Sequence, residues 1–404
     1  MGTSLLPFDE ARARLLADVR VLAAERVPLA EAAGRVLATD VHATEAVPPF
    51  DHSAMDGYAV RSADLAGDGP WELPLVGESA AGRLAPPLAP RATCRILTGA
   101  PVPPGADAVV MQEQVTRRGE AIVFGTRPRA GLNVRRQGED LARGALALVA
   151  GQRVSAGSIA LAAMAGHAEV VVARRPVVTI LCTGDELRAA GEERPPGTIP
   201  ESNAAAIAAL ARQAGAIVRI APIARDEPGQ TLQAIQGALD GTDVLVTVGG
   251  VSVGDHDVVR PALEKAGVTL EFWRVAIKPG KPLAVGTNAR ARILGLPGNP
   301  ASALVTFALF GSPLLRAAQG DERPLPSALR VRVAGARARS TDRLELLRAS
   351  LEREGDDLVA RPHDNQSSGA ATSLALSDGL AFVPPGPDPV EAGTRVDFVR
   401  WSDV

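Results

Sequence analysis

The sequence predicts a multidomain protein in which a central α/β domain is flanked by β-rich regions. Its 404 residues exceed what a single hydrophobic core usually holds. Between residues 176 and 322, apolar stretches alternate with helical patterns of about a dozen residues, which is typical of a doubly wound parallel sheet. We expect an N-terminal helical or extended domain at 1–45 and 141–175, an irregular β-rich domain at 46–140, the α/β domain at 176–322, and a small C-terminal β-barrel at 323–404.

The elements before the α/β domain follow from simple patterns. Residues 9–40 have helical periodicity that breaks at Pro28. From residue 46 to 150, short apolar runs between Pro and Gly clusters predict irregular β-structure. Residues 155–173 predict a helix followed by a strand.

The α/β segment is the most regular part of the chain. A helix is expected at 202–215, with a Ser202 or Asn203 cap and an end at Gly215. The other predicted helices lie at 231–241, 257–267 and 299–320, and the strands at 176–182, 216–223, 242–250, 270–277 and 291–298. After residue 323, strands are expected at 329–339, 378–386 and 394–401.

Composition and charge narrow the class of protein. Hydrophobic content of 46% and charged content of 22% are normal for a soluble globular chain. The net charge of −3 provides no basic surplus for nucleic acid or anionic lipid. No apolar run of 18 residues and no signal-peptide core is seen, and the spacing of Cys94 and Cys182 matches no zinc motif. We expect a cytoplasmic protein without nucleic-acid or membrane partners.

The stretch 249–257, GGVSVGDHD, allows two interpretations. Residues 250–254 match the G-x-S-x-G nucleophile elbow of serine hydrolases, with Ser252 as the nucleophile. However, the chain has no HGGG loop, and His256 lies only four residues after Ser252. Gly249 and Gly250 also permit a sharp turn whose N–H groups bind an anion. We favour the anion site, with Ser252 as a hydroxyl that bonds a phosphate or a metal ligand.

Charged residues gather at the predicted carboxyl ends of the strands, where α/β sheets bind ligands. Lys278 and Lys281 lie in the stiff loop KPGKP and suit contacts to an oxyanion. Carboxylates follow several of these strands: Asp185, Glu186, Asp226, Asp255 and Asp257. Each alone is more typical of a structural role, such as compensation of the dipole at a helix start. Together, beside an anion site, they indicate a hard cation between them, and Mg²⁺ is the economical choice.

Seven motifs together resemble the molybdopterin molybdenumtransferase family, which includes MoeA and the gephyrin E domain. They are PPFDHSAMDGYAV (48–60), ILTGAPVPPGADAVVMQE (96–113), NVRRQGEDL (133–141), TGDEL (183–187), GGVSVGDHD (249–257), FWRVAIKPGKP (272–282) and LPGNPASALVTF (296–307). The resemblance covers nearly the whole chain. It implies a dimeric four-domain enzyme with a molybdopterin-binding α/β domain. It also implies a Mg²⁺-dependent reaction in which adenylylated molybdopterin exchanges AMP for molybdate, the last step of molybdenum cofactor synthesis.

The resemblance also assigns residues and partners. It implies catalytic roles for Asp56, Asp140, Glu186, Asp226, Asp257, Lys278 and Lys281, with Glu186 and Asp257 as metal ligands. It implies substrate contacts by Thr98, Thr183, Gly184, Gly249, Gly250, Ser252, Gly254, Arg274, Pro297, Gly298, Asn299, Ser367 and Ser368. Asp56, Thr98 and Asp140 are expected to face the α/β site of the partner subunit in a homodimer. Further possible partners are the molybdopterin adenylyltransferase and the recipient molybdoenzymes.

Two residues depart from the family pattern. His52 stands where the family has Asn, and Arg274 stands where Lys is common. His52 can titrate near neutral pH, and Arg274 replaces a point charge by a planar fork. Two alternatives to the transferase stay open from the sequence: a paralogue that acts on tungstate or another nucleotide, and a non-catalytic scaffold.

Overall fold

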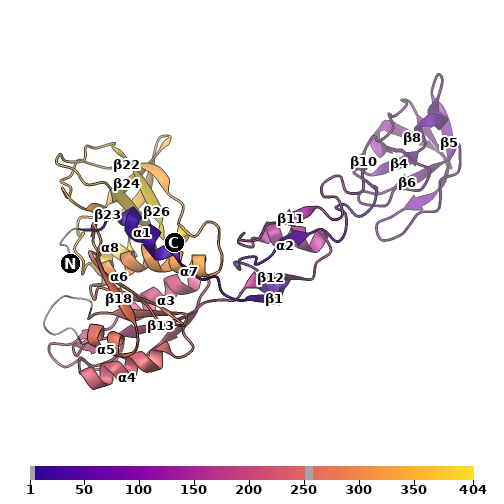
Figure 1. Cartoon of the computed structure of the whole chain (residues 1–404). Helices are drawn as coiled ribbons and strands as arrows, with labels where there is room; N and C mark the ends of the chain where they lie inside the picture. Colours follow the sequence, from indigo (N-terminus) through magenta and orange to yellow (C-terminus); the bar gives the residue numbers. More distant parts are fainter. Residues whose placement is uncertain (1–4, 251–257) are drawn as a thin grey trace. The chain divides into compact units, whose positions relative to one another are not determined.

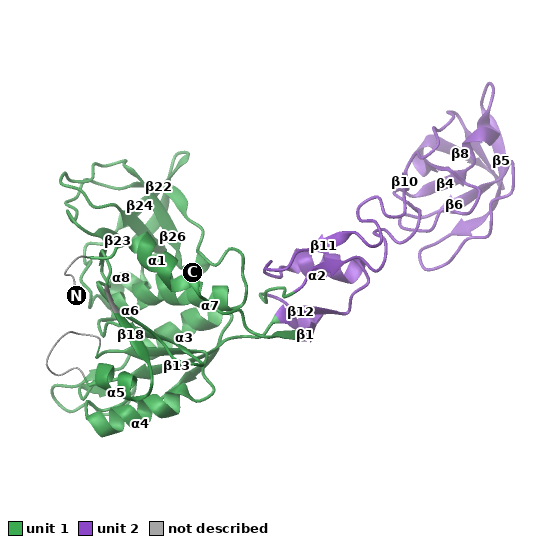
Figure 2. Cartoon of the chain, in the orientation of Figure 1, with its two compact units in different colours: residues 1–25, 34–38, 173–404 green, residues 26–33, 39–172 purple. Residues whose placement is uncertain are grey.

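The computed structural model describes residues 5–250 and 258–404. It forms two compact units (Figure 2): unit 1 comprises residues 1–25, 34–38 and 173–404, and unit 2 comprises 26–33 and 39–172. The four-domain division expected from the sequence stays a prediction. The first helix belongs to unit 1, because α1 (Phe8–Ala17) buries Phe8, Ala11 and Leu15 in the same core as the α/β sheet.

A six-stranded sheet forms the centre of unit 1 (Figure 1). Its spatial order is β16 (Ile217–Ile220), β13 (Val177–Cys182), β17 (Val244–Val248), β21 (Arg292–Leu296), β20 (Pro282–Thr287) and β18 (Thr269–Arg274). The first four strands are parallel, as predicted. The sheet is nevertheless mixed, since β20 pairs antiparallel with both β21 and β18. The sequence analysis did not predict β20. The Lys-Pro-Gly loop before it reverses the chain direction, so that β20 runs antiparallel beside β18.

The strands of this sheet are apolar on both faces. In β17, Val244, Val246 and Val248 face the larger core, whereas Leu245 faces the other side. Helices α3 (Asn203–Gln213), α6 (Pro300–Thr306) and α7 (Ser312–Ala318) cover the larger core, and α4 (Pro228–Leu239) and α5 (Val259–Lys265) cover the smaller one. Burial on both faces explains the continuous apolar runs that predicted a parallel sheet.

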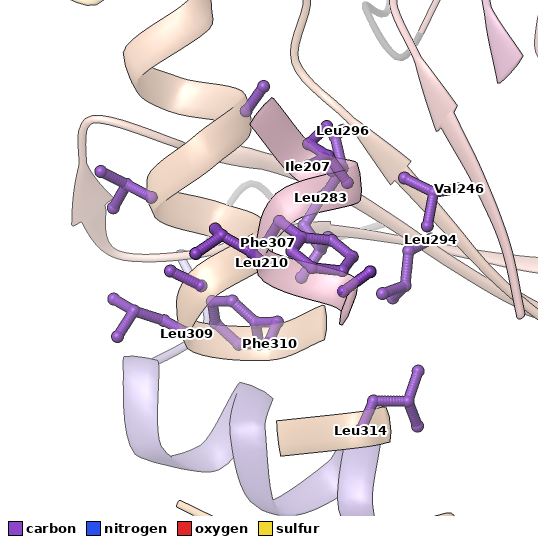
Figure 3. Packing of buried hydrophobic residues seen from close by; sticks show 14 of the residues in the cluster. Ile207, Leu210, Val246, Leu283, Leu294, Leu296, Phe307, Leu309, Phe310 and Leu314 are labelled. Atoms are coloured by element: carbon purple, nitrogen blue, oxygen red, sulfur yellow. The ribbon is translucent and has the colours of Figure 1, made fainter. Parts of the chain in front are cut away.

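Helices α6 and α7 join through a π-helical turn, η4 (Phe307–Gly311), into one long buried segment. Figure 3 shows Phe307 and Phe310 of this turn beside Ile207 and Leu210 of α3. A side chain at Gly311 would place its Cβ 2.4 Å from the ring of Phe307, so the glycine lets the ring pack there. By length and composition the helix over 300–318 could span a membrane, but 83% of its most apolar window is buried inside the protein, as in a core helix.

The C-terminal part of unit 1 is a small barrel, as predicted. It contains β22 (Leu329–Val333), β23 (Leu344–Glu354), β24 (Asp357–Pro362), β25 (Gly379–Val383) and β26 (Arg395–Arg400), with helix α8 (Ala371–Ala375). A pairing between β23 and β25 closes these five strands. The short strand β19 (Ile277–Lys278) comes from the α/β segment and pairs parallel with β23, so the barrel sheet also contains the start of the KPGKP loop.

Unit 2 contains a further six-stranded sheet and three strand pairs among the residues that the structure describes. The sheet order is β7 (Ala108–Met111), β4 (Gly57–Val60), β6 (Thr93–Ile96), β5 (Trp71–Ser79), β9 (Ala121–Phe124) and β8 (Val115–Arg118). The pairs are β3 (His52–Ser53) with β10 (Val134–Arg135), β2 (Val41–His42) with β11 (Leu146–Leu148), and β1 (Ala24–Pro28) with β12 (Glu169–Ala173). Helix α2 (Ala156–Met164) precedes β12, which confirms the helix and strand predicted over 155–173.

Two local predictions are wrong. The helical pattern over 9–40, which was predicted to break at Pro28, ends already at Ala17. The residues after Ala17 form β1 and a 3₁₀ turn at Leu29–Glu31, because pairing with β12 overrides the helical pattern. The side chain of Ser202 makes no cap hydrogen bond to α3. The Glu201 carboxylate instead accepts hydrogen bonds from the backbone N–H groups of Asn203 and Ala204. The helix does end at a left-handed Gly215, as predicted.

Candidate active site

A cavity of about 290 Å³ lies at the carboxyl ends of β13 and β17 in unit 1. Its lining combines three loops that follow strands or precede helices. The residues are Cys182, Thr183, Glu186, Leu187, Ile199, Pro200, Ser202, Asn203, Val248, Gly249, Gly298, Asn299 and Pro300. This is where a doubly wound sheet binds ligands, because strand ends and helix starts meet there with free backbone groups. Seven of these residues belong to the predicted TGDEL, GGVSVGDHD and LPGNP motifs.

The floor of the cavity depends on glycine. Gly249 has a φ of +92° and follows β17 directly. A Cβ at Gly249 would lie 2.8 Å from the carbonyl oxygen of Thr183 and 3.1 Å from its Oγ1. Gly184 similarly lets the Glu186 carboxylate approach, since a Cβ there would lie 2.5 Å from Glu186 Oε2. Close backbone contact, rather than turn formation alone, therefore requires glycine at position 249. At position 184 the near atoms belong to the end of the Glu186 side chain, which can move aside.

The hydroxyl of Thr183 stands out within this cavity. The residue is 5% exposed, and its Oγ1 has no hydrogen-bond partner in the part of the chain that the structure describes. A buried hydroxyl without a partner costs free energy, so native proteins rarely keep one without use. Thr183 lines the cavity, and a ligand there could provide the missing bond.

Carboxylates gather beside the cavity. The backbone N–H of Asp185 donates to Asp226 Oδ2, and that of Asp226 donates to Asp185 Oδ1, both at 3.4 Å. Burial, followed by the charges of Asp185 and Glu186, raises the pKa of Asp226. A nearby cation would relieve this repulsion. Across residues 5–250 and 258–404, no three His, Cys, Asp or Glu side chains form a ready metal cage. Mg²⁺ fits such a site even so, since it keeps several waters and uses only one or two carboxylates plus phosphate oxygens.

The predicted LPGNP loop meets the serine-rich loop of the barrel. Pro297 is buried at the end of β21, and Asn299 Nδ2 donates to Ser368 Oγ at 3.0 Å. The carbonyl of Ser368 accepts from Ala301 N–H at 3.0 Å. The backbone carbonyl of Ser367 accepts a hydrogen bond from Arg348. Ser368, one of the predicted substrate-contacting residues, therefore contacts the LPGNP loop directly, whereas its contact with substrate stays a prediction.

Arg348 is a residue that the sequence analysis missed. It lies on β23 and is fully buried. Its Nη2 donates to the carbonyls of Ser367 at 3.0 Å and Asn365 at 3.3 Å, and its Nε donates to Ser373 Oγ at 3.0 Å. The guanidinium therefore supports the loop that touches Asn299. In the sequence it is one arginine among many in an alternating strand, so no pattern distinguishes it.

The predicted cations do not line the cavity. Lys278 Nζ forms an ion pair with Glu345 Oε1 at 2.8 Å, across the pairing of β19 with β23. Lys281 is exposed, and so is Arg274 at the end of β18. Gly280, between the two lysines, has a φ of +102° and packs against Thr306. Ser252, Gly254, Asp255 and Asp257 lie outside the described residues, whereas Gly250 follows Gly249 with a φ of +63°.

Unit 2 contains the remaining predicted residues. Asp56 Oδ1 accepts from the backbone N–H of Thr98 at 2.7 Å and from its hydroxyl at 2.8 Å. These two hydrogen bonds hold the pKa of Asp56 below its usual value. The structure thus brings the SAMDGYA and LTGA motifs together and leaves the exposed carboxylate charged at neutral pH.

Asp140 lies in a separate cavity of unit 2, of about 370 Å³. Val47, Pro48, His52, Arg135, Glu139 and Met164 complete its lining. His52 Nδ1 lies 3.2 Å from the carbonyl of Ser53. Because His52 stands where the family pattern has Asn, an imidazole lines the same cavity as the predicted functional residue Asp140.

Family models cover the chain in the order of these elements. Residues 6–166 match the MoeA N-terminal region (domains I and II), 179–317 match a probable molybdopterin binding domain, and 330–401 match the MoeA C-terminal region (domain IV). A molybdopterin molybdenumtransferase 2 of Mycobacterium tuberculosis is 37% identical, with 92% of this chain and 93% of the relative covered. The chain belongs to the MoeA family.

Other MoeA relatives agree with this assignment. The molybdopterin molybdenumtransferase of Haemophilus influenzae is 39% identical over 79% of each chain. A crystal structure of the molybdopterin biosynthesis MoeA protein from Pyrococcus horikoshii OT3 has a TM-score of 0.84 and 28% identity, and covers 98% of this chain and 100% of its own. These relatives confirm the family and the multidomain fold class predicted from the sequence motifs.

Proposed function

We propose that this MoeA-family chain inserts molybdate into adenylylated molybdopterin and releases AMP, the last step of molybdenum cofactor synthesis. The observation that carries the proposal is the unit 1 cavity, where the unpartnered Thr183 hydroxyl, the Gly249 turn and the Glu186 carboxylate meet. The relatives named molybdopterin molybdenumtransferase support the same reaction.

The cavity suits an anionic substrate at its glycine side. Gly249 and Gly298 are neighbours there, since a Cβ at Gly298 would lie 3.9 Å from Gly249 Cα, in ordinary van der Waals contact. The lack of side chains on both loops lets a phosphate or molybdate oxygen approach closely. The Gly249 N–H already donates to the carbonyl of Leu296, so another donor, such as the Thr183 hydroxyl, would bond the oxygen there. In the proposal, Thr183 bonds the substrate there, and Gly184, Gly250, Ser252, Gly254, Pro297, Ser367 and Ser368 shape the same region.

The carboxylates are proposed to act with Mg²⁺. Glu186 and Asp257 would hold the ion, and Asp226 would lie beside them as a further charge. When bound, Mg²⁺ would neutralise the phosphate charge that develops as AMP leaves. Lys278, Lys281 and Arg274 would provide cationic charge nearby for the incoming oxyanion. The ion pair with Glu345 fixes Lys278, so substrate must compete for it or use the remaining N–H groups of its ammonium.

The unit 2 residues are proposed to complete the site in a homodimer. Asp56, held by Thr98, and Asp140 would face the α/β cavity of the partner subunit. Asp56 is suited to this role because its hydrogen bonds keep it ionised and fix its direction. An ionised, preoriented carboxylate needs no reorganisation when substrate arrives.

The test follows AMP release from adenylylated molybdopterin by chromatography, with purified protein, Mg²⁺ and molybdate. Reactions with tungstate, without oxyanion, and with Mg²⁺ chelated run alongside, together with Glu186→Gln and Asp257→Ala. Molybdate-dependent release that fails without Mg²⁺ and in both variants is the expected result. Tight substrate binding without release would instead indicate a binding platform, and preference for tungstate would indicate a divergent paralogue.

A further inference from the structure

The first residue of helix α3 contacts the LPGNP loop directly. Asn203 Nδ2 donates a hydrogen bond to the carbonyl of Gly298 at 2.8 Å. Both residues line the unit 1 cavity, and they come from elements almost a hundred residues apart in sequence. Within the described ranges, no other side chain donates a hydrogen bond to this carbonyl. Asn203 therefore fixes the turn of the LPGNP loop at Gly298.

Asn203 is itself fixed by the residue two positions before it. Glu201 Oε1 accepts from the backbone N–H of Asn203 at 2.6 Å and of Ala204 at 2.9 Å. The thiol of Cys182, at the end of β13, donates to the same oxygen at 3.3 Å. Burial raises the pKa of this thiol, which keeps it protonated and able to donate. The start of α3 is therefore tied to the central sheet.

This arrangement also decides where an anion can bind. Glu201 already occupies the free N–H groups at the start of α3 and places a negative charge there. An oxyanion is consequently excluded from that helix end and directed to the glycine side of the cavity, at Gly249 and Gly298. The position of the Gly298 turn then controls the geometry of the anion site, and Asn203 sets that position.

The contact extends beyond the loop. Gly249 N–H donates to the carbonyl of Leu296, so the LPGNP strand end also supports the Gly249 turn. On the other side, Asn299 donates to Ser368. Release of the Gly298 carbonyl would loosen one anchor of a loop that touches both the glycine turn and the barrel.

We infer that Asn203 is a positioning residue for the transfer reaction, which holds the LPGNP loop in its active geometry through the Gly298 carbonyl. The inference rests on the proposed function. Asn203 does not need to touch the reacting atoms, and its effect should appear in turnover and in the local order of the loop rather than in global stability.

The test compares Asn203→Asp with the wild-type protein. Aspartate has the same shape but replaces the donor by an acceptor that repels the Gly298 carbonyl. We expect kcat/KM for molybdate-dependent AMP release to fall about tenfold, since one hydrogen bond at a reacting loop is worth about that factor. Amide hydrogen exchange at 298–303 should become faster. Asn203→Gln, which keeps an amide donor, should recover part of the activity.

The control is Gln236→Glu, which makes the same amide-to-acid change on an exposed position of α4. It should leave kcat/KM and exchange at 298–303 unchanged. Wild-type rates in Asn203→Asp, or reduced rates with unaltered exchange at 298–303, would overturn the inference. Faster exchange spread evenly through unit 1 would show a merely structural role and would also overturn it. An inactive wild-type protein would defeat the proposed function, whereas exchange would still test the loop contact.

Discussion

Replacement of Thr183 by Val should raise the free energy of unfolding of the substrate-free protein and also raise KM for the substrate. Valine has nearly the same shape, but it lacks the hydroxyl that has no partner in the described chain. An unsatisfied buried hydroxyl costs about 1–3 kcal/mol. Because Thr183 borders a cavity that water can enter, we expect the lower end, a gain of about 1 kcal/mol, or roughly 2–4 °C in Tm for a unit of this size.

Thr179 provides a matched control on β13, the strand that ends one residue before Thr183. It is 4% exposed, and its Oγ1 lies 2.5 Å from Oγ1 of Thr242. Thr179→Val breaks this pair and should lower the free energy of unfolding by about 1 kcal/mol, since a paired buried hydroxyl contributes about that much. The same chemical change should therefore have opposite signs at the two positions.

The assay pairs denaturant unfolding with AMP release. Thr183→Val should raise KM several-fold, because a hydrogen bond to the substrate is lost, whereas Thr179→Val should leave KM unchanged. The reasoning is refuted if Thr183→Val destabilises the protein as much as Thr179→Val does. It is equally refuted if Thr183→Val becomes more stable with unaltered kinetics, since the hydroxyl would then have no use in the reaction.

Three further predictions concern charged groups. Burial opposes ionisation of Asp243, but hydrogen bonds from Arg174 and a backbone N–H outweigh it and lower its pKa. Asp243→Asn should therefore lower the free energy of unfolding at pH 7 by about 1–2 kcal/mol. In urea titrations at lower pH, this difference should disappear as the pH falls through the pKa of Asp243 in the folded protein. Asp226 has a raised pKa, so its ionised form disfavours folding. Asp226→Asn should therefore raise Tm at pH 7 but leave Tm unchanged below pH 4, where both states are protonated. Mg²⁺ should reduce the difference in Tm between the wild-type protein and the variant at pH 7. Arg348→Met should accelerate hydrogen exchange at 365–368 before it affects the rest of unit 1; uniform acceleration would contradict the assigned role.

Periodicity predicted the elements of the α/β domain better than their pairing. β13, β17 and β21 have continuous apolar runs because both of their faces are buried, and that signal is local. The antiparallel β20 and the barrel strand β19 depend on how the KPGKP loop turns, which no short-range pattern specifies. The helical prediction over 9–40 is wrong after Ala17 for the same reason. The residues that follow form β1 because they pair with β12, a strand more than a hundred residues later in the sequence.

The candidate site divides in a similar way. Motifs found Thr183, Glu186, Gly249, Gly298 and Asn299, which the fold gathers around one cavity. Family resemblance, rather than physical reasoning, added the pair of Asp56 and Thr98.

Supporting residues were not foreseen from the sequence. Arg348, Glu201 and Asn203 act through backbone carbonyls and N–H groups. Such contacts leave no spacing signature, because the partner can be any residue type.

Phe8 stacks edge-on against Phe310, with ring centroids 5.5 Å apart, and against Phe382 at 6.0 Å. Helix α1 is thus made well before its aromatic partners, which follow it much later in the chain. At common elongation rates the interval is roughly 20–75 s. Residues 39–172 of unit 2 leave the ribosome within that interval and can fold first. During this time the apolar face of α1, formed by Phe8, Ala11 and Leu15, has no completed core to pack against.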